Sequence, residues 1–255
     1  MCVTAHPDDE SAAFGGALMW ARDQGAETSV VCLTDGQAAT FRGDSNGNEE
    51  LAAVRRNEFA AACEVLGVTH PEVLHFQDGK LAETNFYEVV GVLVARIRTL
   101  RPQVLLTFGT EGGSNLHRDH TMASLATTAA FHWAGSVAYF PEQLSNGLAA
   151  YAPQKLYLLQ PPFVAPYRSA NPAETPITTC TLEMNLTEYM ERKLKAFLMH
   201  TTQQGVLERV RGAFDKYAGC ECYLLAASKS TNRKDDALFD GISLDHAVSA
   251  ADSGE

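Results

Sequence analysis

The feature that most constrains the fold is an alternation of short apolar runs with longer segments of helical spacing. Runs that are apolar or β-branched lie at 1–5, 27–34, 72–76 and 103–108, as in strands buried between two layers. The alternation predicts an α/β fold, Rossmann-like, with a mostly parallel sheet and helices on both faces. The predicted helices occupy 10–24, 49–66, 85–100 and about 120–133.

The second half of the chain is less regular. Strands are predicted at 155–159 and 179–186, and a helix is predicted at 187–203 with Thr187 as its N-cap. The Pro-rich stretch 161–176 is expected to be either a lid over a site or a surface connection.

The chain is long enough for one large domain with a substantial core. It has 255 residues, of which 45% are apolar and 20% charged, as in ordinary globular proteins. We predict a single α/β domain over 1–227. A polar tail is expected at 228–255.

The charge of the chain excludes several classes of partner. A net charge of -11 argues against binding to nucleic-acid phosphates and to anionic membrane surfaces. No apolar run approaches the ~18 residues of a membrane span, and no secretory signal is recognisable. We therefore expect a cytoplasmic protein with a small-molecule substrate, and a homo-oligomer is compatible with it. The six cysteines are expected to be reduced thiols.

Three unusual polar stretches follow predicted strands. HPDDE follows the first strand, TDGQ follows the second, and GTEGGSNLHRDH follows the apolar strand at 103–108. Ligands of open α/β sheets bind at the carboxyl ends of the strands. We therefore expect these stretches to meet at one edge of the sheet, where the active site should lie.

The acidic run Asp8–Asp9–Glu10 has two interpretations. Acidic residues are common at helix N-termini, where the helix dipole favours them, so the run could be a simple cap. That interpretation leaves His6 unexplained. Alternatively, a cation compensates the three carboxylates.

The stretch HRDH favours the cation. It places His117 and His120 three residues apart with Asp119 between them, at another predicted helix start. Imidazole nitrogens and carboxylate oxygens together suit zinc and other first-row metals. A carboxylate left over beside a metal is a natural general base. The histidines His70, His75, His132 and His246 are interpreted as core or surface imidazoles, and His200 as a helix-end residue that the helix dipole favours.

In this order the motifs resemble one family. AHPDDE, TDG, Arg55 and Glu58 on a helix, TFGTEGGSNLHRDH and HTTQ together resemble the PIG-L/LmbE family of zinc-dependent N-acetylglucosaminyl deacetylases. The resemblance runs from Ala5 to Gln203. Arg118 stands where the family commonly has proline, and the first strand is unusually short.

The resemblance implies a role for each matching residue. His6, Asp9 and His120 would be the ligands of Zn2+ or of another divalent first-row metal, and Asp8 would be the general base. His117 would stabilise the oxyanion or protonate the departing amine. Asp119 would orient His117, and Arg55 would contact a hydroxyl or phosphate of the substrate.

The predicted function is metal-dependent hydrolysis of an N-acyl amide, in first place N-acetyl, on an amino sugar or its conjugate. One alternative is an amidase that acts on another sugar-linked amide, such as a thiol conjugate. A second alternative is a non-catalytic carbohydrate-binding relative. The absence of G-x-G-x-x-G after the first strand argues against a dinucleotide-binding domain.

Overall fold

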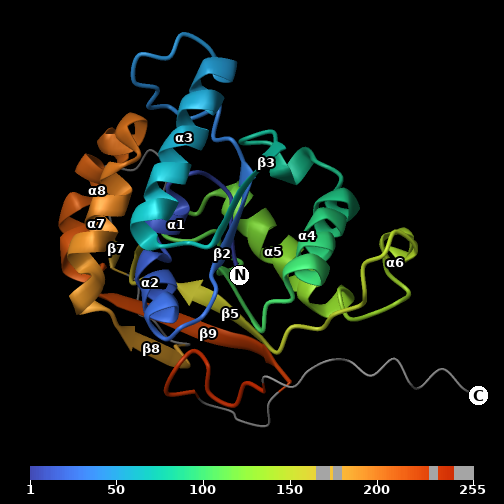
Figure 1. The fold of residues 1–255 in the computed structure, drawn as a ribbon. Coiled ribbons are helices and arrows are strands. Elements are labelled where there is room, and N and C mark those ends of the chain that lie inside the picture. Colours follow the sequence, from blue (N-terminus) through green and yellow to red (C-terminus); the bar gives the residue numbers. More distant parts are fainter. Residues whose placement is uncertain (165–172, 175–179, 230–234, 244–255) are drawn as a thin grey trace, which may run out of the picture.

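A seven-stranded sheet between two layers of helices forms the body of the protein (Figure 1). The computed structural model describes residues 1–164, 173–174, 180–229 and 235–243. The strand order is β3-β2-β1-β4-β5-β9-β8. The sheet strands are β1 (Cys2–Thr4), β2 (Ser29–Thr34), β3 (His70–Phe76), β4 (Val104–Phe108), β5 (Lys155–Gln160), β8 (Leu182–Asn185) and β9 (Cys220–Ser228), and β6 (Phe163–Val164) pairs separately with β7 (Ala173–Glu174).

The helices fall into two groups. Helices α1, α2, α3, α7 and α8 lie on one side of the sheet in Figure 1, and α4 and α5 lie on the other. This confirms the Rossmann-like α/β prediction. The helices are α1 (Asp9–Ala12), α2 (Gly15–Asp23), α3 (Asn48–Leu66), α4 (Phe86–Leu100), α5 (Arg118–Trp133), α6 (Pro141–Ser145), α7 (Met190–Leu198) and α8 (Gln204–Tyr217).

The order of the strands reverses at β1. Strand β1 pairs in parallel with β2 on one side and with β4 on the other, and every residue of these three strands is buried. A reversal of this kind opens a crevice at the carboxyl ends of the strands. The loops that carry HPDDE and HRDH follow β1 and β4, so both lead into that crevice.

The predicted helix 10–24 is interrupted between α1 and α2. The carboxylate of Glu221, which is buried, accepts hydrogen bonds from the amides of Gly16 (2.9 Å) and Ala17 (3.1 Å). A side chain on Gly16 would collide with this carboxylate and with Leu186. Glu221 thus satisfies the free amides of a new helix start, a contact from strand β9 that local spacing does not reveal.

The predicted helix 187–203 is also wrong in its bounds. Residues Thr187–Tyr189 form a 3-10 turn, and the N-cap of α7 is Tyr189 rather than Thr187. The side chain of Asn185 accepts the Thr187 amide at 3.2 Å and the Thr187 hydroxyl at 2.8 Å. A second turn, Thr201–Gln203, separates α7 from α8. Helix α8 was not predicted.

The expectation of six reduced cysteines is wrong for one pair. Cys180, which precedes β8, and Cys222 on β9 form a disulfide, with their Cα atoms 5.6 Å apart. Pairing of β8 with β9 brings together two residues that are 42 positions apart in the sequence.

Part of the predicted tail packs against the sheet. Asp235 is buried and lies 2.7 Å from the Nζ atom of Lys155 on β5, and its other oxygen accepts the Tyr157 hydroxyl at 2.5 Å. Leu238 joins the main core. Most of the Pro-rich stretch lies outside the described residues, which leave out 165–172 and 175–179. His246 lies outside them as well. In the described segments, no helix is long and apolar enough to cross a membrane.

Candidate active site

Four strands deliver polar side chains to one edge of the sheet. His6 follows β1, Asp78 follows β3, and His117 and His120 lie at the start of α5 after β4. His6 lies against both histidines, with ring centroids 4.7 Å from His117 and 5.2 Å from His120. The loop after β2 reaches the same place, since Ala38 and Thr40 line the same pocket. The predicted convergence of these stretches is therefore confirmed.

The two nitrogens of the His6 imidazole have different neighbours. Its Nε2 atom lies 3.1 Å from Asp78 Oδ1 and 3.4 Å from Asp119 Oδ2. Two carboxylates at this nitrogen favour the tautomer in which Nε2 carries the proton. The lone pair of Nδ1 then faces Asp9 and His120.

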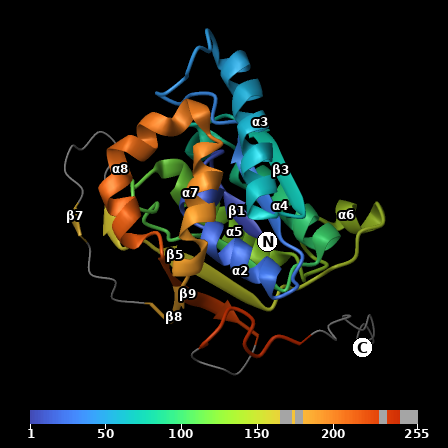
Figure 2. The ribbon, with the colours of Figure 1, turned by 60° about the vertical axis from the view of Figure 1, so that its left-hand side comes forward.

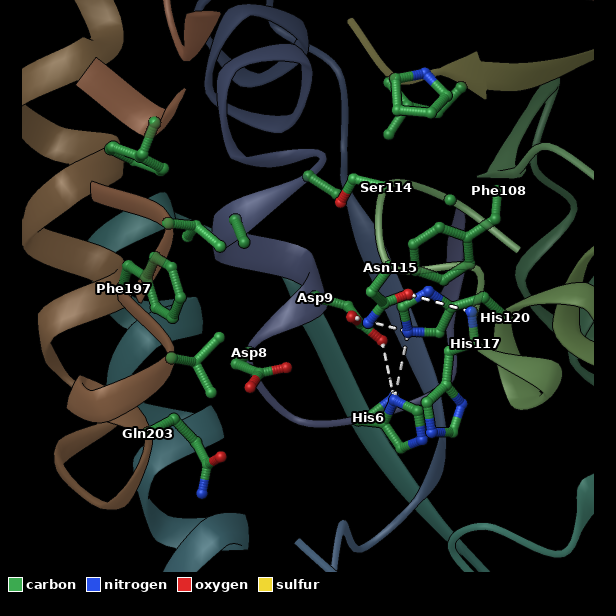
Figure 3. Close-up of a pocket in the computed structure, with 18 of the residues that line it drawn as sticks. His6, Asp8, Asp9, Phe108, Ser114, Asn115, His117, His120, Phe197 and Gln203 are labelled. Atoms are coloured by element: carbon green, nitrogen blue, oxygen red, sulfur yellow. Dashed lines mark hydrogen bonds and ion pairs between the residues drawn. The ribbon is translucent and has the colours of Figure 1, made fainter. Parts of the chain in front are cut away.

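His120 is oriented in the corresponding way. Its Nδ1 atom lies 3.1 Å from the carbonyl oxygen of Gly112, and its ring stacks on Phe108 with centroids 4.0 Å apart. The carbonyl accepts a proton only from Nδ1–H, so the lone pair of Nε2 faces His6 and Asp9. Figure 3 shows the side chains of His6, Asp9 and His120 pointing toward one another. They come from the loop after β1, from α1 and from α5.

The three facing atoms are spaced like ligands of one metal ion. His120 Nε2 lies 3.2 Å from His6 Nδ1 and 3.2 Å from Asp9 Oδ1, and His6 Nδ1 lies 3.5 Å from the other Asp9 oxygen, Oδ2. Metal bonds of about 2.0–2.1 Å place tetrahedral ligands roughly 3.3 Å apart. The residues present therefore fit a divalent metal.

Other donor sets in the same cluster could also hold a metal. His6, His117 and His120 form one such group, and His6, Asp78 and Asp119 form another. In the second group, the Asp119 carboxylate already accepts the amides of Gly79 (2.6 Å) and Leu81 (3.2 Å). Hydrogen bonds of this kind suit a residue that orients a ligand rather than a ligand itself.

The cluster carries an excess of negative charge. Burial alone would lower the pKa of His6, but its carboxylate neighbours, Asp119 first, raise it well above the usual range. Burial would raise the pKa of Asp78, yet His6 holds it at about 2. Asp9 has its pKa lowered despite burial, mainly by His120. An anionic cluster of this kind attracts a cation.

Asp8 differs from Asp9 in direction and environment. Its backbone adopts φ 128°, which is unusual for a residue with a side chain, and its carboxylate lines the pocket. Figure 3 shows Asp8 between the histidine cluster on one side and Phe197 and Gln203 on the other. Burial raises the pKa of Asp8 to about 6, although Arg55 opposes the shift.

Two buried groups hold Asp8 in this conformation. The Nη2 atom of Arg55 donates to the Pro7 carbonyl and to Asp8 Oδ2 (3.1 Å), and its Nη1 atom donates to the Gly36 carbonyl (2.9 Å). On the other side, the carboxylate of Glu10 accepts the Asp8 amide at 3.0 Å. Arg55, predicted to contact substrate, lines the pocket but is 2% exposed and is bonded to the protein itself.

Glu10 is itself held by His200. Nε2 of His200 lies 2.6 Å from Glu10 Oε1, and neither side chain is exposed. Burial would lower the pKa of His200, but Glu10 raises it. Interpreting His200 as a helix-end residue missed this contact. The only signal in the sequence was its place in HTTQ, whose two threonines bond Glu58 on α3.

His117 and Asp119 are arranged differently from the prediction. Nδ1 of His117 accepts the main-chain amide of Asp119 at 3.1 Å, so Nε2 carries the proton in the neutral ring. Burial, His6 and His120 lower the pKa of His117 to about 4. The Asp119 carboxylate was expected to orient His117, but its side-chain contacts given above orient His6. Asp78, which follows β3 as HPDDE follows β1, was missed although the same rule applies to it.

One pocket of about 420 Å³ is lined by His6, Asp8, Asp9, Arg55, Asp78, His117 and His120. The profile of the PIG-L family, described as GlcNAc-PI de-N-acetylase, matches residues 1–131. The chain belongs to the PIG-L family. A mycothiol S-conjugate amidase from Streptomyces coelicolor is 31% identical over an alignment 286 residues long. The alignment covers 95% of this chain and 96% of that protein.

Two further relatives act on other amino-sugar compounds. A 1D-myo-inositol 2-acetamido-2-deoxy-alpha-D-glucopyranoside deacetylase from Rhodococcus jostii is 31% identical, but the match covers 54% of this chain and 55% of that protein. The solved structure of N,N'-diacetylchitobiose deacetylase from Pyrococcus horikoshii superimposes with a TM-score of 0.68 and 25% identity. That match covers 84% of this chain and 74% of that one. Membership of the PIG-L family is thus clear, while the substrates of its members differ.

Proposed function

We propose that this PIG-L protein hydrolyses an N-acyl amide, in first place N-acetyl, on an amino sugar or its conjugate. The observation that carries the proposal is the convergence of His6 Nδ1, the Asp9 carboxylate and His120 Nε2 beside the Asp8 carboxylate, which lines the pocket. A site for binding alone would not need a further, partly buried carboxylate next to a metal site. The relatives named above, an amidase and two deacetylases, support this class of reaction.

The metal we propose is zinc, held by His6, Asp9 and His120. Mixed nitrogen and oxygen ligands suit zinc, and catalytic zinc sites have three protein ligands. When bound, such an ion acidifies water and polarises the amide carbonyl. Asp78 and Asp119 hold the proton of His6 Nε2, and the Gly112 carbonyl holds the proton of His120 Nδ1, so both rings keep their orientation.

Asp8 takes the proton from the attacking water in this mechanism. Its carboxylate faces the pocket and is fixed by Arg55, which we assign to positioning of Asp8 rather than to substrate contact. The φ value of 128° is maintained because Glu10 accepts the N–H and Arg55 donates to the C=O of the peptide group that joins Pro7 to Asp8. Asp8 can then pass the proton to the departing amine.

His117 stabilises the negative charge that develops on the carbonyl oxygen. Because Nδ1 accepts a main-chain amide, the neutral ring carries its proton on Nε2, which is the donor atom that this role needs. A fixed donor in a partly buried site is worth more than one in water, since it needs no reorganisation as the charge forms. His117 lines the pocket next to His6 and His120, where that oxygen would lie.

A second candidate is an amidase that acts on a sugar-linked amide other than acetyl. The match to the S. coelicolor amidase favours it, because that match extends over 95% of this chain. Both candidates use the same cluster and differ only in the acyl group and the sugar partner. They are therefore distinguished by substrate rather than by mechanism.

The test is release of primary amine by the zinc-loaded protein from a small panel of amides. The panel holds N-acetylglucosamine, N-acetylglucosaminyl-inositol, N-acetylglucosaminyl-malate, diacetylchitobiose and one thiol conjugate. Release from an acetylated member supports the deacetylase, and release from the thiol conjugate alone supports the amidase. No release from any member, with zinc bound, would contradict the proposed function.

A further inference from the structure

The pocket continues well beyond the histidine cluster. From Asp8 it extends along helices α7 and α8, and its wall there is built mainly from Ala12, Phe197, Val206, Val210, Ala213 and Phe214. None of these side chains has a polar atom. Figure 3 shows Phe197 across Asp8 from the histidines. We call this part of the pocket the apolar arm.

The apolar arm is a consequence of how α8 packs. A small hydrophobic cluster, separate from the main core, joins Phe197 of α7 with Leu207, Phe214 and Ala218. Val206, Val210 and Ala213 follow one another at helical spacing, so they share one face of α8. All three are partly exposed and line the pocket. The face of α8 next to its core contacts is therefore presented to the pocket.

The charged groups along this arm already have partners in the protein. Lys193 Nζ lies 2.7 Å from Glu221 Oε1, and Glu221 also accepts two amides of α2. The guanidinium of Arg209 lies over the ring of Phe41, 5.3 Å from its centroid. A sugar needs several polar partners, and these are concentrated at the other end, around Asp8 and Asp78. The arm offers mainly apolar contact.

We propose that the apolar arm binds an alkyl or acyl chain of several carbons on the substrate. This inference rests on the proposed function, because the reacting amide must lie at the histidine cluster for the chain to reach the arm. An acetyl group at the cluster would leave the arm without a ligand group. Pockets of this size and character bind ligands that bury most of their surface.

The chain could belong to either side of the amide, and two substrate series distinguish them. One series is N-acetylglucosaminides with methyl, butyl, hexyl and octyl aglycones. The other is glucosamine carrying acetyl, butanoyl, hexanoyl and octanoyl groups. Burial of each methylene is worth about fourfold in kcat/KM. Because two buried methylenes already give more than about tenfold, one series should rise at least about tenfold from its first to its third member.

A pair of neighbouring variants on α8 tests the location. Ala213→Leu places three more carbons in the arm, and we expect the ratio of kcat/KM between the long and the short substrate to fall toward one. Gly212→Leu is the matched control. A Cβ atom on Gly212 meets no atom within 4 Å, so this variant should keep the activity and the ratio of the wild type.

Calorimetry with octyl glucosaminide and with free octanoate provides a readout without turnover. Binding that Ala213→Leu weakens and Gly212→Leu does not would support the arm, even if no amide is hydrolysed and the proposed function fails. Turnover that is indifferent to chain length in both series would overturn the inference and leave the proposed function intact. An equal loss of chain dependence in both variants would also overturn it.

Discussion

The two halves of this protein are built on different principles. In residues 1–131, parallel strands end in loops that bring His6, Asp9 and His120 together. In residues 155–228, the strand β9 is antiparallel, and a disulfide and the pair Lys193–Glu221 join the elements. The first half supplies the reacting groups. The second half supplies one wall of the pocket. It also supplies His200, the residue that holds Glu10.

This difference suggests a division of roles that can be tested. Family membership follows the first half, since the family profile matches residues 1–131. Changes in the first half should abolish chemistry while the fold remains, and changes in the second half should affect stability or the choice of substrate. His200 is the exception, because it acts on the first half from the second.

The largest effect is expected from His120→Ala. Loss of one of three proposed ligands should release the metal, and kcat/KM should fall by about a thousandfold or more, because several kcal/mol of charge stabilisation are lost. Zinc content by mass spectrometry and amine release measure both effects. His132→Ala on the same helix is the control, since His132 is exposed and distant along α5. Retention of zinc by the His120 variant would contradict the ligand assignment.

The next effect is expected on stability, from Asp235→Ala in the second half. Lys155 and Asp235 are both almost fully buried, so removal of the carboxylate leaves an unpaired buried ammonium. Such changes cost about 3–5 kcal/mol of unfolding free energy. Urea denaturation measures it, with the adjacent exposed Asp236→Ala as control. Equal midpoints for the two variants would show that the segment after β9 does not stabilise the sheet.

Removal of the disulfide should have a somewhat smaller effect. The double variant Cys180→Ser/Cys222→Ser removes a bond that closes a loop of about 40 residues, worth roughly 2–4 kcal/mol. We expect a lower melting temperature without loss of zinc, because neither residue lies in the first half. Cys220→Ser, an exposed free thiol in the same strand, should melt as the wild type does. Simultaneous loss of zinc would contradict the division between the halves.

Removal of the Glu10 side chain, which His200 of the second half holds, should have the smallest effect. Glu10→Ala removes the acceptor of the Asp8 amide and should lower kcat about 10- to 100-fold with little change in KM, through misplacement of the base. Glu10→Gln keeps an acceptor oxygen and should recover part of the loss.

A double-mutant cycle separates positioning from general damage. If Glu10 acts through Asp8, Glu10→Ala should cost nothing further in a protein that already carries Asp8→Asn. An additive loss in the double variant would show that Glu10 has a merely structural role.

The same division explains how much the sequence could predict. Strands β1, β2 and β4 were predicted because burial on both faces makes them apolar throughout. The cluster was predicted because its residues directly follow those strands. Helix α8 was missed because Gly205 and Gly212 weaken its helical pattern, and its contacts with α7 stabilise it instead.

The remaining errors concern contacts between distant parts of the chain. The Cys180–Cys222 bond joins residues 42 positions apart, and the break between α1 and α2 depends on Glu221. The His200–Glu10 pair spans 190 positions. Local spacing contains no information on such pairs. Asp78 is different, because the rule that selected His6 would have selected it too.

The measurement that tests the central claim most directly compares wild type and Asp8→Asn for zinc content and amine release on the best substrate of the panel. Asp8 lies beside the proposed ligands but does not belong to them, so the variant should bind zinc as the wild type does. Its kcat should fall roughly 10²- to 10⁴-fold, as expected for loss of a general base. Normal turnover by the zinc-loaded variant would contradict the assignment of Asp8 as the base and with it the proposed mechanism.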